Sequence, residues 1–279
     1  MELGMYMRPM SHTEQKLYLY LESMSKNIFR LPEIEHERLG LSRGHYHTLI
    51  SRLVKKGWIK RAGHGTYLRN PPLSVRAGPY YIEDPFETGL KMYGGYIAFH
   101  TAMYLYGLND NQPVMIYVAT PSKSETVDLG PYHRIKAVKM GRRFTGIRTK
   151  DKYRISTLMK TIFDCFDHVM HSGGYPDLLK SITFAESYGF GGSLDWNEFE
   201  VYLDEFASSS LCQKIGYMLS LLKEEGIYET PDDLMEYLRG RIKNKTNLFG
   251  GRLGGKYDRN WMVVDNIGRR ALLSWHYHG

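Results

Sequence analysis

The first 40 residues alternate apolar and polar positions at helical spacing. A helix is predicted behind Ser11-His12-Thr13-Glu14, because a serine followed three residues later by a glutamate fits a capping box. Its apolar face is formed by Leu17, Tyr20, Leu21, Met24 and Ile28. Since proline suits a first helical turn, a second, short helix is predicted over residues 32–39.

A third helix is predicted to follow Ser42, whose hydroxyl suits an N-cap, and to end at Gly57. Its apolar face comprises Tyr46, Leu49, Ile50 and Leu53. Residues 58–61 and 66–68 favour short strands, and the glycine-containing turn between them indicates a hairpin. Three helices followed by a hairpin predict a winged helix-turn-helix domain over residues 1–70.

The rest of the chain mixes helix and strand patterns. Residues 71–85 include four prolines and are expected to form a stiff linker. Helices are predicted over 95–108, 176–188, 195–206, 211–225 and 231–242, and one more is predicted to be capped by Ser156 and to run through Asp167. Strands are predicted over 114–119, 132–140, 144–148 and 261–265. The predicted fold class is therefore α/β (α+β), with a larger mixed α/β domain over 86–279 behind the winged helix.

Composition restricts the class of protein. A chain of 279 residues corresponds to about two domains, and 42% hydrophobic with 24% charged residues is ordinary for a folded protein. No run of 18 apolar residues occurs, and residues 1–10 lack the apolar core of a secretory signal. Cys165 and Cys212 are the two cysteines of the sequence, which is typical of a reduced, cytoplasmic protein with no membrane association.

Positive charge is concentrated in one stretch. The net charge is +7, and residues 38–82 contain no acidic residue. The cations of this stretch are Arg38, Arg43, Arg52, Lys55, Lys56, Lys60, Arg61, Arg69 and Arg76. Such a concentration favours a polyanionic partner, because cations that neutralise phosphates release counterions. We therefore expect double-stranded DNA to bind here, with an affinity that falls steeply as salt rises.

The polar face of the third helix supplies most of the candidate DNA contacts. The candidates are Ser42, Arg43, His45, His47, Thr48, Ser51, Arg52, Lys55 and Lys56 on the helix, with Arg61 and His64 on the hairpin. The N-terminal half of such a helix reaches base edges in the major groove, while the later lysines contact phosphates. The hairpin is expected to contact the DNA backbone or the minor groove.

Three enzyme-like motifs do not meet the requirements of their chemistry. Gly250-Gly251-Arg252-Leu253-Gly254-Gly255-Lys256-Tyr257 resembles a phosphate-binding loop, but it ends in tyrosine and precedes a predicted strand. Asp204 and Glu205 are adjacent on a predicted helix and point about 100° apart, so they do not converge on a metal. Cys165, His168 and His171 lack a second ligand cluster. We expect no catalytic activity, no cofactor and no metal site.

Several segments of the second part of the chain resemble a known family. They are Tyr96-Ile97-Ala98-Phe99-His100 with Leu105-Tyr106-Gly107-Leu108, then 116–120, 153–167, 207–222 and 257–266. In this order, and behind a predicted winged helix, they are similar to the AbiEi antitoxin family. The resemblance implies a DNA-binding autorepressor of a phage-defence toxin–antitoxin operon, whose second domain neutralises a partner nucleotidyltransferase toxin.

Two other functions stay open at this point. A stand-alone regulator would use the second domain to sense a small ligand, and a closed pocket lined by tyrosines would favour it. A DNA-processing enzyme would need acidic residues that converge in a cleft. Under the antitoxin interpretation, we expect DNA upstream of the chain's own gene and a toxin as the two partners, and we expect each of the two domains to fold alone.

Overall fold

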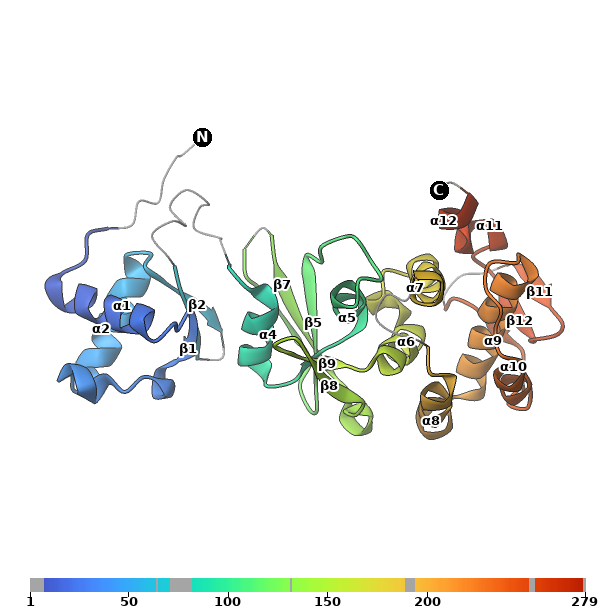
Figure 1. The fold of residues 1–279 in the computed structure, drawn as a ribbon, viewed down its shortest axis with the longest axis horizontal. Coiled ribbons are helices and arrows are strands. Elements are labelled where there is room, and N and C mark those ends of the chain that lie inside the picture. The colour runs from blue at the N-terminus through green and yellow to red at the C-terminus, as the bar shows by residue number, and fades with distance from the viewer. Residues whose placement is uncertain are drawn as a thin grey trace. The chain divides into compact units, whose positions relative to one another are not determined.

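A computed structural model describes residues 8–63, 65–70, 82–130, 132–188, 194–250 and 254–277. These residues form helices and strands in a mixed α/β fold, which confirms the predicted fold class (Figure 1). The chain divides into two compact units, each described by itself below. Unit 1 comprises residues 1–96 and 114–140, and unit 2 comprises residues 97–113 and 141–279. The predicted linker 71–85 falls within unit 1, and residues 71–81 of it lie outside the described residues.

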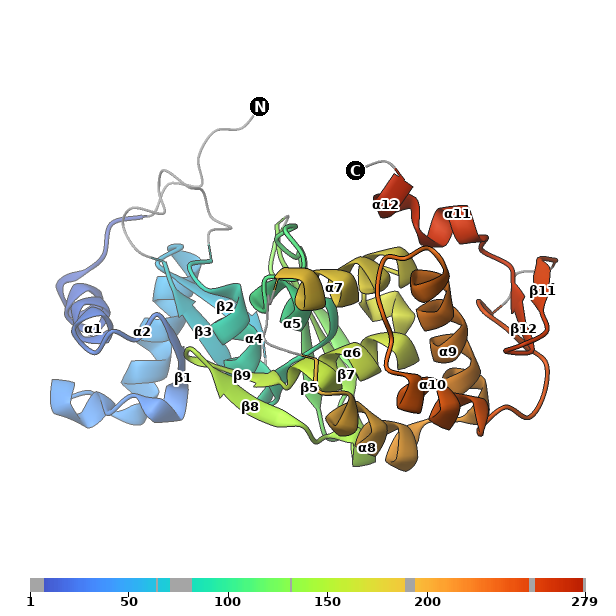
Figure 2. The same cartoon turned by 45° about the vertical axis from the view of Figure 1, so that its right-hand side comes forward.

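The first 70 residues of unit 1 contain two α-helices and a small antiparallel sheet, drawn in blue shades in Figures 1 and 2. The elements are α1 (His12–Ser23), β1 (Ile28–Arg30), α2 (Arg43–Lys55), β2 (Ile59–Gly63) and β3 (Thr66–Arg69). The strand order is β1-β3-β2, so β3 is central and the other two strands are the edges. Gly65 lies in the turn between β2 and β3 with φ of 71°, a backbone conformation that favours glycine.

The first predicted helix begins as expected and ends earlier. The backbone N–H of Ser11 donates to Glu14 Oε2 at 2.6 Å, and the N–H of Glu14 donates to Ser11 Oγ at 3.4 Å, which confirms the capping box. The helix ends at Ser23, and Ser25 has a left-handed backbone with φ of 52°. The placement of Ile28 on this helix was wrong, because Ile28 lies in β1 and pairs with Leu68.

The predicted helix over 32–39 was also wrong. The chain forms two separate 3₁₀ turns there, η1 (Leu31–Glu33) and η2 (His36–Leu39). Ile34 between them has an extended backbone, with φ of −107° and ψ of 116°. Its side chain is buried in the core. Because Ile34 reaches the core from an extended backbone, the two 3₁₀ turns do not join into the continuous helix that the sequence predicted.

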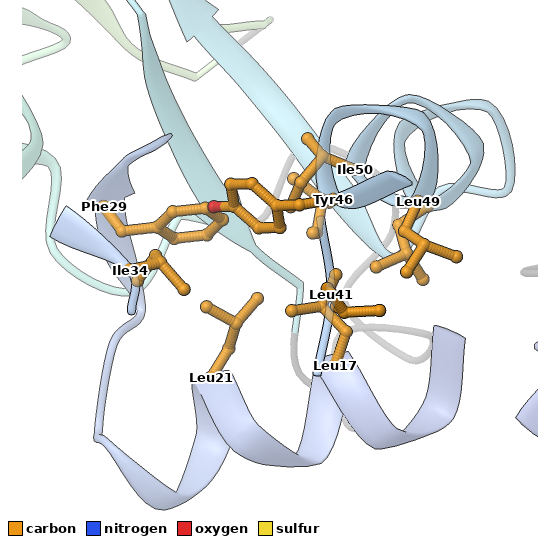
Figure 3. Packing of buried hydrophobic residues seen from close by; sticks show 10 residues of the cluster. Leu17, Leu21, Phe29, Ile34, Leu41, Tyr46, Leu49 and Ile50 are labelled. Carbon is orange, nitrogen blue, oxygen red and sulfur yellow. The ribbon is translucent and has the colours of Figure 1, made fainter. Parts of the chain in front are cut away.

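One apolar core joins these elements (Figure 3). Leu17 and Leu21 of α1, Phe29 of β1 and Tyr46 and Leu49 of α2 are all almost completely buried within it. The buried face of α2 is the one that the sequence predicted. Because side chains from α1, β1, α2 and β2 share this core, residues 11–70 pack as one body.

The remainder of unit 1 consists of one helix packed against three hydrogen-bonded strands. Its elements are α4 (Pro85–Tyr93), β5 (Met115–Thr120), β6 (Glu125–Asp128) and β7 (Arg134–Lys139). β5 and β7 are parallel, β6 is antiparallel to β7, and α4 packs on β5 (Figure 1). The strands predicted over 114–119 and 132–140 are confirmed. β6 was not predicted, because it alternates polar residues with partly buried ones and has no continuous apolar run.

Unit 2 is mostly helical. Its longer helices are α6 (Leu158–Asp167), α7 (Tyr175–Tyr188), α8 (Trp196–Phe206), α9 (Ser209–Glu224) and α10 (Asp232–Arg239). α6 packs against α5 (Phe99–Leu105), α7, α8 and α9 (Figure 2). The strands β8 (Ile147–Lys150) and β9 (Tyr153–Ser156) form a hairpin, and Ile97 of β4 (Tyr96–Ile97) pairs with Ile155 of β9.

The C-terminal part of unit 2 adds a second small sheet and two short helices. The sheet consists of β10 (Thr246–Asn247), β11 (Lys256–Asp258) and β12 (Val263–Asp265), and β12 is its central strand. α11 (Arg269–Leu272) and α12 (Ser274–Tyr277) pack against α7. The predicted last strand is confirmed in β12.

The single helix predicted over 95–108 was wrong at its start. Tyr96 and Ile97 form β4, and α5 begins only at Phe99, whose backbone is left-handed with φ of 55°. This conformation turns the chain from the strand into the helix. An apolar stretch of this length does not by itself distinguish a buried helix from a strand followed by a helix.

α6 begins with a different cap from the predicted one and contains a buried ion pair. Thr157, rather than Ser156, accepts the hydrogen bond from the Lys160 N–H, while the Ser156 hydroxyl bonds that of Thr161 at 2.7 Å. Lys160 Nζ lies 2.5 Å and 2.6 Å from the two carboxylate oxygens of Asp164, and both side chains are completely buried. Burial raises the pKa of Asp164 to about 6, against the attraction of Lys160.

We predict that Asp164→Asn lowers the free energy of unfolding by about 3–5 kcal/mol, because it leaves the Lys160 ammonium buried without its counter-charge. Urea unfolding measures the effect. The matched control is Asp151→Asn, which removes the partner of Lys150 from a pair at 3.2 Å whose aspartate side chain is 76% exposed. That change is expected to stay within about 0.5 kcal/mol. Equal effects of the two substitutions would contradict the role of the buried pair.

Candidate nucleic-acid interface

The polar side of α2 forms an exposed surface. The exposed residues are Ser42, Arg43, His45, His47, Thr48, Ser51, Arg52 and Lys55. Tyr46, Leu49, Ile50 and Leu53 point into the core. The helix therefore divides into the two faces that its sequence predicted, and the candidate side chains of one face reach solvent.

Local hydrogen bonds set the beginning of α2. Ser42 is the N-cap and its Oγ accepts from the His45 N–H at 3.4 Å. The Thr48 hydroxyl donates to the Gly44 carbonyl at 3.0 Å, so its hydrogen is used within the helix and its oxygen is left as an acceptor. The His47 ring lies edge-on to Tyr46 with 5.7 Å between the ring centroids. The first turn has no acidic residue, which leaves its positive dipole end unopposed.

Gly44 occupies an unusual place in this first turn. A Cβ atom added there meets no atom within 4 Å, and its backbone φ is not positive. A glycine inside a helix costs about 0.5–1 kcal/mol relative to alanine. Neither packing nor backbone conformation of the described chain requires glycine at this exposed position.

Four cations of the acid-free stretch are bound to groups from elsewhere in the chain. Arg38 pairs with Glu35, Lys56 with Glu14, and Arg69 with Glu22, while Lys60 donates to the Leu129 carbonyl. Arg76 lies outside the described residues, as does His64. Among the described residues of the stretch, the cations that are exposed and form no ion pair are Arg43, Arg52, Lys55 and Arg61.

Lys56, which the sequence predicted as a phosphate contact, forms an ion pair within unit 1. Its Nζ donates to Glu14 Oε2 at 2.6 Å, and the Glu14 side chain is 1% exposed. Burial by itself raises the pKa of Glu14, but the Lys56 ammonium and the Ser11 donors lower it below its ordinary value. The pair therefore stabilises the fold above the unfolded pKa of Glu14, and this contribution is lost as the pH falls through the lowered folded pKa. Lys56 joins α2 to α1.

The other candidate sites lie in unit 2. A cavity of about 510 Å³ is lined by residues that include Tyr217, Tyr257, Asp265 and Arg269. The Tyr217 hydroxyl donates to Asp265 at 2.8 Å, and the backbone N–H groups of Ile267 and Gly268 also donate to Asp265, so these two side chains have partners within the chain. Within the described residues, no three His, Cys, Asp or Glu side chains are placed to hold a metal ion. No described helix is long and apolar enough to cross a membrane.

Comparison with known proteins identifies a related family in the first segment. Residues 16–70 match the family model described as a transcriptional regulator, AbiEi antitoxin. No curated protein matches the chain. The predicted resemblance to AbiEi regulators is thus confirmed over residues 16–70. The later segments that carried the resemblance in the sequence, between residues 96 and 266, lie outside this match. The description of this family suggests a transcriptional regulator or antitoxin, with DNA and a toxin as general classes of partner.

We predict that two neighbouring lysines of α2 affect DNA binding differently. With about four phosphate contacts, the log–log dependence of affinity on salt has a slope of about −3.6. Lys55→Gln is expected to reduce the magnitude of this slope by about 0.9. Lys56→Gln is expected to leave the slope unchanged and to lower the free energy of unfolding, since Glu14 loses its partner. Filter binding over a salt series, with urea unfolding alongside, checks both; an equal loss of slope in the two variants would place Lys56 on the DNA.

Proposed function

We propose that the chain is a transcriptional autorepressor that binds double-stranded DNA upstream of its own gene, and an antitoxin for a nucleotidyltransferase toxin. The observation on which the DNA-binding part rests is the distribution of charge on α2 and β2. In the part of the stretch that the structure describes, Arg43, Arg52, Lys55 and Arg61 are exposed and form no ion pair, whereas Lys56, Lys60 and Arg69 are bound to groups of unit 1 and the exposed Arg38 is paired with Glu35.

In this proposal residues 1–70 act as a winged helix. α2 enters the major groove, and its first turns, with Arg43, His47 and Thr48, face the base edges. Arg52 and Lys55 contact phosphates, and the β2–β3 hairpin places Arg61 on the DNA backbone. The absence of acidic residues from α2 and the hairpin supports a polyanionic partner.

Gly44 supports the same docking. A position without a side chain in an exposed first turn allows a partner backbone to approach the helix closely. A DNA strand that crosses the beginning of α2 is such a partner, and the positive end of the helix dipole favours its phosphates.

In the antitoxin part of the proposal, residues 86–279 neutralise the toxin by binding the toxin protein directly. This part is supported by the family that residues 16–70 match and by the resemblance of the later segments. The proposed domains are 1–70 and 86–279 with the linker 71–85 between them. A stand-alone regulator that senses a ligand is the second candidate, and the cavity beside Tyr217 and Tyr257 favours it.

A separation of the two activities tests this function. The triple variant Arg43→Ala, Arg52→Ala, Lys55→Ala is expected to lose binding to the upstream DNA of its own gene, at least a hundredfold, because three phosphate or base contacts disappear. It is still expected to restore growth of cells that express the neighbouring toxin. Gel shift and a growth assay give the two readouts. Loss of rescue together with DNA binding would mean that neutralisation does not belong to 86–279, and a gene neighbourhood without a toxin would favour the stand-alone regulator.

Gly44→Ala is predicted to change stability and DNA binding in opposite directions. Alanine is expected to raise the free energy of unfolding by about 0.5–1 kcal/mol, because it suits a helix better than glycine. It is expected to weaken DNA binding about tenfold, because a Cβ keeps the DNA strand away from the first turn. Thermal unfolding and gel shift measure the two effects. DNA binding that stays equal or improves would show that no partner approaches Gly44.

A further inference from the structure

Both edge strands of the small sheet β1-β3-β2 are held by a cation that donates to a backbone carbonyl in the later part of unit 1. Arg30 provides this contact from β1, and Lys60 provides it from β2. Neither cation has the exposed position of the candidate DNA contacts, since both are partly buried. The two contacts lie at opposite edges of the sheet and involve two different elements.

Arg30 binds the C-terminal end of α4. Its Nη2 donates to the carbonyl of Lys91 at 2.6 Å and to that of Met92 at 3.2 Å. The last carbonyls of a helix have no partner within the helix, and a cation there also interacts favourably with the helix dipole. α4 ends at Gly94 in a left-handed conformation, so these carbonyls face the Arg30 guanidinium instead of a further turn.

Lys60 binds the connection between β6 and β7. Its Nζ donates to the carbonyl of Leu129 at 2.5 Å, and the Leu129 side chain is buried. Burial lowers the pKa of Lys60, and the Asp128 carboxylate opposes this effect. Successive side chains of a strand point to opposite faces, so Lys60 points towards β6 and β7 while Arg61 is exposed.

The end of β2 is close to the same elements. A Cβ atom built on Gly63 lies 3.4 Å from the Met92 side chain and 3.9 Å from Val127. The β2 strand of the hairpin therefore contacts the later part of unit 1 at Lys60 and next to Gly63, rather than projecting freely from residues 1–70.

We propose that Arg30 and Lys60 are positioning residues for DNA binding, and that the DNA-binding unit includes α4 and the β6–β7 connection of unit 1 in addition to residues 1–70. The inference rests on the proposed function. The two contacts order the hairpin before DNA arrives, so that Arg61 reaches the DNA without the loss of entropy that a mobile hairpin would incur. Neither residue touches the DNA. Release of either edge weakens binding but leaves the number of neutralised phosphates unchanged.

The test uses the full chain with Lys60→Met, Arg30→Met, Lys60→Arg and the neighbouring exposed control Arg61→Met. Lys60→Met and Arg30→Met are expected to reduce affinity for the upstream DNA about three- to tenfold with the salt slope of the unaltered chain. Lys60→Arg keeps a donor and is expected to restore most of the affinity. Arg61→Met is expected to reduce the magnitude of the slope by about 0.9. A loss of slope in Lys60→Met, or an unchanged affinity in both methionine variants, would overturn the proposal.

Hydrogen exchange of the free protein gives a readout that does not depend on DNA. The amides of β2 and β3 are expected to exchange faster in Lys60→Met and Arg30→Met, while those of α2 keep their rates. Equal hairpin exchange in all variants overturns the attachment. If the unaltered chain binds no DNA while the exchange rates change as expected, the proposed function fails and the attachment of the hairpin stands.

Discussion

The acid-free stretch from residue 38 to residue 82 has to find its counter-charges elsewhere in the chain, and the organisation of unit 1 depends on this requirement. Glu14 and Glu22 of α1 bind Lys56 and Arg69, and the Leu129 carbonyl binds Lys60. Each contact joins residues far apart in the sequence. The same contacts relieve the mutual repulsion of the cations, and they decide which of the cations stay on the surface.

Under the proposed function, this partition has a consequence for DNA binding. The exposed cations of α2 and β2 lie on elements whose opposite faces are fixed by the core around Tyr46 and by the contacts of Lys56 and Lys60. A surface of this kind is presented by a rigid support, which limits the ordering that a bound DNA demands. The family match over residues 16–70 covers most of α1, α2 and the small sheet, whereas Glu14 and Leu129, the partners of Lys56 and Lys60, lie outside it.

Unit 2 contains a buried ion pair rather than an excess of one charge. Lys160 and Asp164 are completely buried on one face of α6 and neutralise each other. Around them the Glu198 carboxylate accepts hydrogen bonds from the hydroxyls of Thr157 and Tyr202, at 2.5 Å and 2.8 Å, so that α8 is held to the beginning of α6. A pair of this kind adds little net stability compared with apolar residues, but loss of one partner leaves the other charge buried without its counter-charge.

Features determined by neighbouring residues were predictable from the sequence. The capping box at Ser11, the cap at Ser42, the two faces of α2 and the hairpin of β2 and β3 all follow from interactions within a few positions. The same local information identified the exposed candidates from Arg43 to Lys55. It failed where an element exists because of a distant partner, as for β1, which pairs with β3, and for the start of 95–108, where β4 pairs with β9.

The roles of the cations were decided by tertiary structure alone. Lys55 and Lys56 are adjacent and chemically identical, yet one is exposed and the other is bound to Glu14, 42 positions away. No spacing signals this difference, because the partner is brought near only when α1 packs on α2. Lys60 is less predictable still, since its acceptor is a backbone carbonyl, which every residue carries. The sequence by itself determined where positive charge is available, and the packing of α1 and of the β6–β7 connection determined which part of that charge faces outward.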